Sequence, residues 1–192
     1  PHGPDRVCLS DIRYVWTREG WLCVWAVLDM CARKLVGWAL AEHMTRELLL
    51  NPLRMANKKH EPPPGLIFHS DRGSQYASDE VRAWLVAQAM RQSMSGTGKC
   101  YDNAPMESYW HSLKVEETHG QDFATRAAAT HSVFAYIEGW YNTTRMHSSL
   151  DYKSPVQFER DHHAKLLKAT NDELIAISRN NSQSARLQKR AA

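Results

Sequence analysis

Three acidic residues stand at positions where an acid either is costly or is well placed for chemistry. Asp11 lies in "LSDIRY", among apolar and aromatic neighbours, and Asp71 follows the apolar run 65–68 in "HSDRGSQY". Glu107 lies in "DNAPMESYW", early in an expected helix, and thirty-five residues separate it from Asp71. A charged group within or beside a buried strand is expensive unless it faces a site. These three carboxylates are therefore the candidate site.

Such a set suits hard divalent cations. If the strands carrying Asp11 and Asp71 are neighbours, both side chains reach one edge of the sheet, and a later helix can bring Glu107 across them. Mg²⁺ binds through a few carboxylates and otherwise keeps water or phosphate oxygens. Two such ions held roughly 4 Å apart would support phosphoryl transfer. Lys114, seven residues after Glu107, lies about two helical turns on and shares its face, where it could hold a DNA backbone.

Taken singly, each acid has a simpler interpretation. Asp71 precedes an Arg-Gly pair and could be a turn residue. Glu107 could be a solvated residue favoured by the positive end of its helix. Asp29, at the end of the second expected strand, is interpreted as a turn acid, and His69 as a hydrogen-bonded structural histidine. Only the combination of Asp11, Asp71 and Glu107 in matched contexts favours a site.

The first half of the chain predicts a sheet of five strands. Short runs rich in Val, Trp, Tyr and Leu, separated by turn residues, are typical of an antiparallel meander. Strands followed by alternating helices and strands indicate an α/β layered sheet. The four tryptophans of the meander, Trp16, Trp21, Trp25 and Trp38, are predicted to pack in the core and on the sheet. The expected strands are 7–16, 20–28, 35–41, 66–69 and 90–94, and the expected helices are about 45–59 (with Pro52 inside) and 78–89.

The second half predicts helices and a tail. A glycine-rich polar loop is expected over 95–103, then helices over 104–117 and about 125–141. From Arg179 onward the chain has basic residues but no acid and almost no large apolar residue, so we expect disorder there. The predicted organisation is one catalytic core with a C-terminal helical extension, residues 1–160, and a partly disordered basic tail, residues 161–192.

Composition bounds the class of protein. With 192 residues, 43% hydrophobic and 23% charged, the chain can bury one good core. No apolar run approaches the roughly 20 residues that a bilayer requires, so no membrane association is expected. The four cysteines form no C-x-x-C pair, which fits a reducing cytosol. A net charge of +3 permits a polyanionic partner without demanding one. Because residue 1 is Pro rather than Met, we expect an N-terminal domain to be missing.

Four motifs, in order, carry a family resemblance: "SDIRY", "HSDRGSQY", "DNAPMES" with "SLK", and "YNTTRMHSSLDYKSPVQF". From about Pro4 to Arg160 the chain resembles the catalytic region of bacterial insertion-sequence DDE transposases, which share the retroviral integrase core. The resemblance implies an RNase H-like fold and Mg²⁺- or Mn²⁺-dependent DNA strand cleavage and transfer. It also implies action as a homodimer or higher multimer on transposon ends and target DNA, in the bacterial cytoplasm and at the nucleoid. Such proteins use an upstream helix-turn-helix, which we expect to be missing from this chain.

By the same resemblance, Asp11, Asp71 and Glu107 are the catalytic metal ligands and Lys114 is a DNA-contacting lysine. Arg13 stands where relatives commonly have Thr, and it could either grip a phosphate or crowd the metals. For Arg145 and His147, phosphate contact and docking against the core are both open. Further candidates for DNA contact are Arg72 and Lys99.

Two other positions depart from the family pattern. The expected loop has Gly96 and Thr97 where relatives usually have an Arg-Lys pair, so two possible phosphate-binding side chains are absent. Asp151 replaces a common glycine in a turn that favours positive φ, a conformation that Asp tolerates better than most residues.

Three functions are consistent with these residues. The first is a DDE transposase or integrase core that uses water and then a DNA 3′-hydroxyl as nucleophile. The second is an RNase H-like nuclease that only hydrolyses, which strand joining would exclude. The third is a degenerate remnant that binds DNA without turnover.

Overall fold

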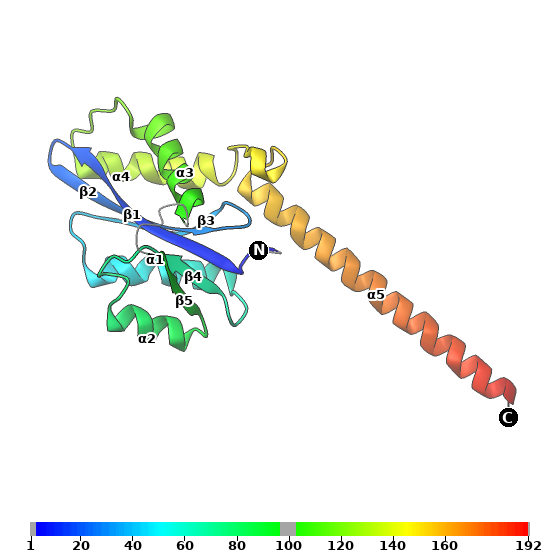
Figure 1. The fold of residues 1–192 in the computed structure, drawn as a ribbon. Helices are drawn as coiled ribbons and strands as arrows, with labels where there is room; N and C mark the ends of the chain where they lie inside the picture. The colour runs from blue at the N-terminus through cyan, green and yellow to red at the C-terminus, as the bar shows by residue number, and fades with distance from the viewer. Residues whose placement is uncertain (1–2, 97–102, 192) are drawn as a thin grey trace.

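The computed structural model describes residues 3–96 and 103–191 and forms a mixed five-stranded sheet flanked by helices (Figure 1). The order of the strands is β3-β2-β1-β4-β5. The first three pair antiparallel, whereas β4 pairs parallel with both β1 and β5. The predicted meander and mixed sheet are therefore confirmed. The strands are β1 (Val7–Thr17), β2 (Gly20–Asp29), β3 (Leu35–Ala41), β4 (Ile67–Ser70) and β5 (Arg91–Met94).

Alternation along β1 places two cores on opposite faces of the sheet. Leu9 and Val15 belong to one buried cluster, with residues of the helices that follow the sheet, and Cys8 and Ile12 belong to the other. Successive side chains of a strand point to opposite faces. Asp11 has the same parity as Leu9 and Val15, so its side chain lies on the face that the later helices cover.

Helices α1 (Arg46–His60) and α2 (Asp79–Ala87) cover one face of the sheet, and α3 (Ala104–Leu113) and α4 (Arg126–Phe134) cover the other (Figure 1). The caps agree with the sequence, since Thr45 accepts a hydrogen bond from Leu48 N at 3.2 Å and Ser78 accepts one from Val81 N at 3.4 Å. Pro52 is tolerated inside α1.

The two helices predicted for the second half each end in a wider turn. The predicted helix over 104–117 is α3 followed by the π-helical η2 (Lys114–Thr118), and the helix over 125–141 is α4 followed by the π-helical η3 (Ala135–Tyr141). A short 3₁₀ turn, η4 (Ser148–Leu150), then leads to Asp151, whose φ of 54° is the left-handed conformation expected there.

Helix α5 (Pro155–Ala191) extends away from the sheet as one continuous helix (Figure 1). The partly disordered tail stays a prediction. The side chains of 164–177 are exposed. Among the described residues, no helix combines the length and apolarity that a membrane span requires.

Candidate functional site

Asp11 and Asp71 lie side by side at the edge of the sheet where β4 ends. Strands β1 and β4 run parallel with Ser10 opposite Ser70, so the next residue on each chain is an aspartate. This is the neighbour relation that the sequence analysis required. Asp11 is buried, with 8% of its surface exposed, whereas Asp71 is exposed.

Three donors hold the carboxylate of Asp11. The indole of Trp110 donates to Oδ2 at 2.9 Å, the backbone N–H of Ile12 donates to Oδ1 at 2.7 Å, and a guanidinium nitrogen of Arg13 lies 3.3 Å from Oδ2. Burial raises the pKa of Asp11 and so does the charge of Asp71, while Arg13, Ile12 and Trp110 lower it; the net shift is upward. A cation between the two aspartates would relieve this repulsion.

Asp71 also has the turn role that the sequence left open. Its Oδ1 accepts the backbone N–H of Gly73 at 2.9 Å, which is the bond of an Asx turn. The next side chain, Arg72, is exposed and donates through Nε to the carbonyl of Ser95 at 2.8 Å. A carboxylate has a second oxygen, so the turn bond leaves Asp71 able to ligate a cation.

Glu107 lies on α3, which contacts β1 through the hydrogen bond from Trp110 to Asp11. Because Glu107 and Trp110 are three residues apart, and Lys114 lies four beyond Trp110, the three occupy one face of the helix. Glu107 and Lys114 are exposed. Within the part of the chain that the structure describes, the carboxylates of Asp11, Asp71 and Glu107 do not form a group whose ligand atoms all lie within 4.8 Å of one another. The structure thus places Asp11 beside Asp71 and Glu107 on the adjacent helix, but it does not bring the three carboxylates close enough to share one ion.

A groove of about 510 Å³ lies beside this edge, and sequence reasoning missed its aromatic wall. The sequence analysis predicted that the four tryptophans pack in the core and on the sheet: Trp25 is fully buried, whereas Trp16 and Trp21 are 58% and 55% exposed at the sheet surface. They face each other across the β1–β2 hairpin with ring centroids 4.9 Å apart. Alternation with Tyr14, also exposed, was the signal for an outward aromatic face at the hairpin end. The groove is also lined by Arg13, Trp110, His111, Lys114 and His119.

Two further DNA-contact candidates are engaged within the fold. Arg145 makes a two-nitrogen ion pair with Glu116, with Nε 2.8 Å and NH2 2.7 Å from Oε1, and its guanidinium lies 5.9 Å from the ring centroid of Tyr141. His147 packs edge-on against Tyr141, and burial, Arg145 and Arg33 lower its pKa to about 4. A neutral imidazole at pH 7 supplies no positive charge to a phosphate.

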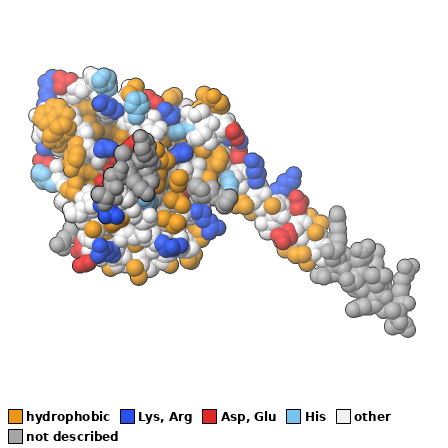
Figure 2. Space-filling model, viewed as in Figure 1, with side chains coloured by type: hydrophobic (Ala, Val, Ile, Leu, Met, Phe, Trp, Pro, Cys, Tyr) orange, Lys and Arg blue, Asp and Glu red, His pale blue; other side chains and the backbone are white. Residues whose placement is uncertain are grey.

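Of three remaining predictions, those for His69 and Asp29 are confirmed, and the one for Lys99 stays a prediction. His69 is a hydrogen-bonded structural histidine, with Nδ1 3.0 Å from Ser93 Oγ and Nε2 3.1 Å from Ser95 Oγ. Asp29 is the predicted turn acid and accepts the N–H of Ala32 at 2.6 Å. Lys99 lies outside the described residues. Figure 2 shows basic, acidic and apolar side chains interspersed on the face presented, in place of one continuous basic stripe.

Comparisons with known proteins agree with this architecture. The Integrase core domain family matches residues 1–100, and a second family with the same description matches residues 107–162. A transposase of insertion sequence element IS904 from Lactococcus lactis is 45% identical over 157 residues, covering 82% of this chain and 62% of the relative. The transposase InsF of insertion sequence IS3A from Escherichia coli is 44% identical, covering 82% and 54%. The chain thus spans between about half and two thirds of the length of these relatives.

Solved structures show the same fold at low sequence identity. A protein in a simian T-cell lymphotropic virus intasome aligns with a TM-score of 0.67 at 14% identity, covering 83% of this chain and 55% of that one. The HTLV-2 integrase catalytic core, solved in complex with magnesium, aligns with a TM-score of 0.56 at 12% identity, covering 82% and 98%. The fold is therefore RNase H-like, as the sequence predicted. With both halves of the chain matched, this protein belongs to the integrase core domain family.

Proposed function

We propose that this chain is the catalytic core of a bacterial insertion-sequence DDE transposase, which cleaves DNA and joins the resulting 3′-hydroxyl to a second strand. The observation that carries the proposal is the pair of aspartates on adjacent parallel strands, with α3 and its Glu107 docked on Asp11 through Trp110. Relatives of this chain that are 44–45% identical are named transposases.

The residues present fit a divalent cation. Asp11 and Asp71 are neighbouring carboxylates, and carboxylate oxygens are the ligands that Mg²⁺ and Mn²⁺ prefer. Burial raises the pKa of Asp11 most, and the charge of Asp71 adds to the rise. Asp11, Asp71 and Glu107 would hold the metal, which we propose to be two ions. Bound there, the ions would activate the attacking oxygen and stabilise the leaving one. Glu107 must turn toward the aspartates to join them.

The chain's own side chains would position the DNA. Lys114 projects from the helix that carries Glu107 and lines the groove, so it is well placed to contact a phosphate. Arg13 is paired with Asp11, and a cation on Asp11 would release its guanidinium toward the backbone of the substrate. Exposed Trp16 and Trp21 offer rings on which bases could stack, an interaction available to every base.

The wider biology is proposed on the same basis. The partners would be transposon ends and target DNA, bound by a homodimer or higher multimer in the bacterial cytoplasm. Selection of the ends would rest with an upstream helix-turn-helix region. Arg72 is a further candidate for phosphate contact, while Arg145 and His147 are better explained by their contacts with Glu116 and Tyr141.

A branched DNA that presents a pre-aligned 3′-hydroxyl tests the proposal, because it removes the need for end recognition. With Mn²⁺ or Mg²⁺, the chain should join the strands, and Glu107→Gln should reduce joining at least a hundredfold. Glu173→Gln, an exposed position on α5, is the matched control. Hydrolysis without joining would favour the nuclease, and binding without either product would favour the remnant.

A further inference from the structure

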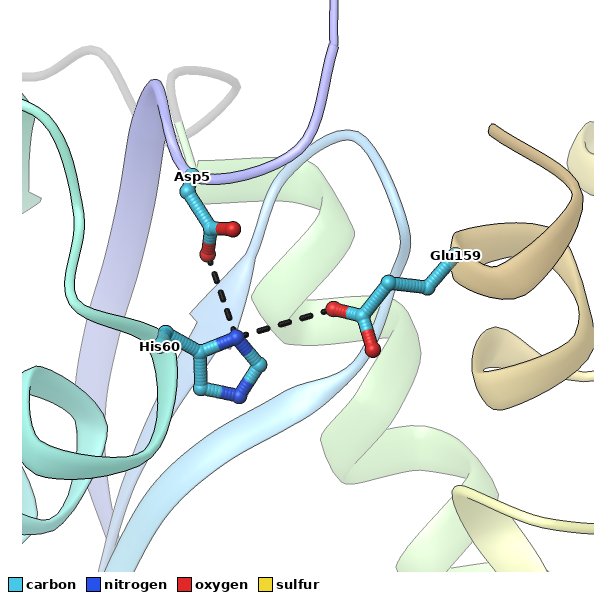
Figure 3. Close-up of side chains that lie close together, drawn as sticks. All are labelled: Asp5, His60 and Glu159. Atoms are coloured by element: carbon cyan, nitrogen blue, oxygen red, sulfur yellow. Dashed lines mark ion pairs between the residues drawn. The ribbon is translucent and has the colours of Figure 1, made fainter. Parts of the chain in front are cut away.

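A second cluster of side chains that could bind a metal lies near the start of β1, whereas the paired aspartates lie where β4 ends. It joins Asp5, just before β1, to His60, the last residue of α1, and Glu159, in the first turns of α5 (Figure 3). Nδ1 of His60 lies 3.2 Å from Oδ1 of Asp5 and 3.6 Å from Oε1 of Glu159. The side chains of His60, Asp5 and Glu159 are only 10%, 16% and 13% exposed.

A single ring proton does not satisfy this arrangement. Nδ1 of His60 can carry one hydrogen, which can be directed at Asp5 or at Glu159 but not at both. Oε1 of Glu159 is buried and has no hydrogen-bond partner among the described residues, although Lys34 binds the other oxygen of the same carboxylate. Leaving a buried carboxylate oxygen without a partner is costly. The unpartnered oxygen points at the imidazole nitrogen, as Figure 3 shows.

A metal ion would satisfy all three atoms. Ligands at about 2.0–2.1 Å around a tetrahedral Zn²⁺ lie about 3.3 Å from one another. The two separations of 3.2 and 3.6 Å bracket that value, and all three ligand atoms lie within 4.8 Å of one another. Imidazole nitrogen favours Zn²⁺ and related transition metals over Mg²⁺.

We propose that Asp5, His60 and Glu159 form a structural transition-metal site, with Zn²⁺ as the best-fitting ion. The ion would fasten the N-terminal segment, the end of α1 and the start of α5 to one another. Because Lys34 occupies the other oxygen of Glu159, the carboxylate would bind the metal through Oε1 alone. The site is separate from the carboxylates proposed for catalysis and would act on the placement of α5.

The test is Zn²⁺ titration of the chelator-treated chain by calorimetry, with thermal unfolding as a second readout. The protein and its variants all carry Asp71→Asn and Glu107→Gln, which removes two of the three carboxylates proposed for catalysis. We expect one equivalent of Zn²⁺ to bind tightly and to raise Tm. His60→Gln and Glu159→Gln should each weaken it at least tenfold, and His163→Gln, on an exposed neighbour, should leave it unchanged.

Two results would overturn the site. Either no Zn²⁺ binds, or it binds with equal stoichiometry and affinity when His60 or Glu159 is replaced. The cluster would then join His60 to Asp5 and Glu159 without a metal ion. Should His60→Gln fail to fold, Glu159→Gln decides the question, because Gln retains the volume of the carboxylate.

Discussion

At the scale of single residues, the basic side chains separate into those that face the groove and those that hold the fold. Lys114 is exposed and lines the groove, whereas Arg145 is bound to Glu116 on two nitrogens. Removing one cation that binds a phosphate lowers the slope of log K against log salt by about 1. We expect Lys114→Ala to weaken DNA binding and to lower the slope by that amount.

Arg145→Ala should behave differently. It should lower the free energy of unfolding by about 1–3 kcal/mol, as expected for a hydrogen bond to a charged partner, and leave the salt slope of DNA binding unchanged. Filter binding at several salt concentrations and urea unfolding measure the two effects. A reduced salt slope in Arg145→Ala would restore Arg145 as a DNA-binding residue.

Asp29 predicts a pH dependence of stability. It is fully buried, and burial, more than any other cause, raises its pKa from 3.8 to about 6. The folded state therefore binds the proton more tightly than the unfolded state, so this group stabilises the fold at low pH and loses that contribution as the pH rises toward and past 6.

Between pH 5 and pH 6.5 the loss amounts to about 1 kcal/mol in the free energy of unfolding. Urea unfolding at the two pH values measures it, with Asp29→Asn as the reference that lacks the titration. The free energy of unfolding of the wild type, relative to that of Asp29→Asn, should rise by about 1 kcal/mol as the pH falls from 6.5 to 5. An identical pH dependence in both proteins would contradict the assignment.

At the scale of elements, α1 is packed on β3 at the closest distance the backbone allows. A Cβ at Gly37 would lie 2.0 Å from the carbonyl oxygen of Pro52. We expect Gly37→Ala to force the helix off the sheet and to lower the free energy of unfolding by about 3 kcal/mol or more, the range of severe packing defects. Gly139→Ala is the control, since nothing lies within 4 Å of its Cβ. Equal stability of the two variants in urea would refute this packing.

The sequence predicted elements well where a local pattern governs them. Runs rich in Val, Trp, Tyr and Leu, bounded by turn residues, located all five strands within one or two residues, and Thr45 and Ser78 marked the starts of two helices. The sequence analysis stated the neighbour relation of β1 and β4 only as a condition for pairing Asp11 with Asp71, and the structure meets that condition. Local pattern could not indicate where a helix widens into a π turn, as at Lys114.

Contacts between residues that are far apart in the chain could not be predicted from the sequence. Asp5, His60 and Glu159 belong to three separate elements, so only the folded chain brings them together. The pairing of Arg145 with Glu116 is also tertiary, and a charged side chain in a loop gave no sign of which partner it would take. Trp16 and Trp21 were expected to pack in the core and on the sheet, and only the folded chain shows that both rings are more than half exposed.

At the scale of the whole molecule, α5 contributes little to the core. The side chains of 164–177 are exposed, including Leu166, Leu167 and Leu174. We expect a chain ending at Lys165 to unfold cooperatively with Tm within a few degrees of the full chain, because the described side chains of the removed segment, residues 166–177, are exposed. Thermal circular dichroism measures this. Disappearance of the cooperative transition would show that α5 supports the core.

Paired aspartates at one sheet edge, holding a metal-dependent centre for DNA strand joining, are the core of the proposed function. Their most direct test is joining on a branched DNA with Mn²⁺, comparing the wild type with Asp71→Asn and with Asp172→Asn, an exposed acid on α5. We predict joined product from the wild type and Asp172→Asn, none without metal, and at least a hundredfold less from Asp71→Asn with unchanged circular dichroism. Equal joining by Asp71→Asn and the wild type would contradict the proposed centre.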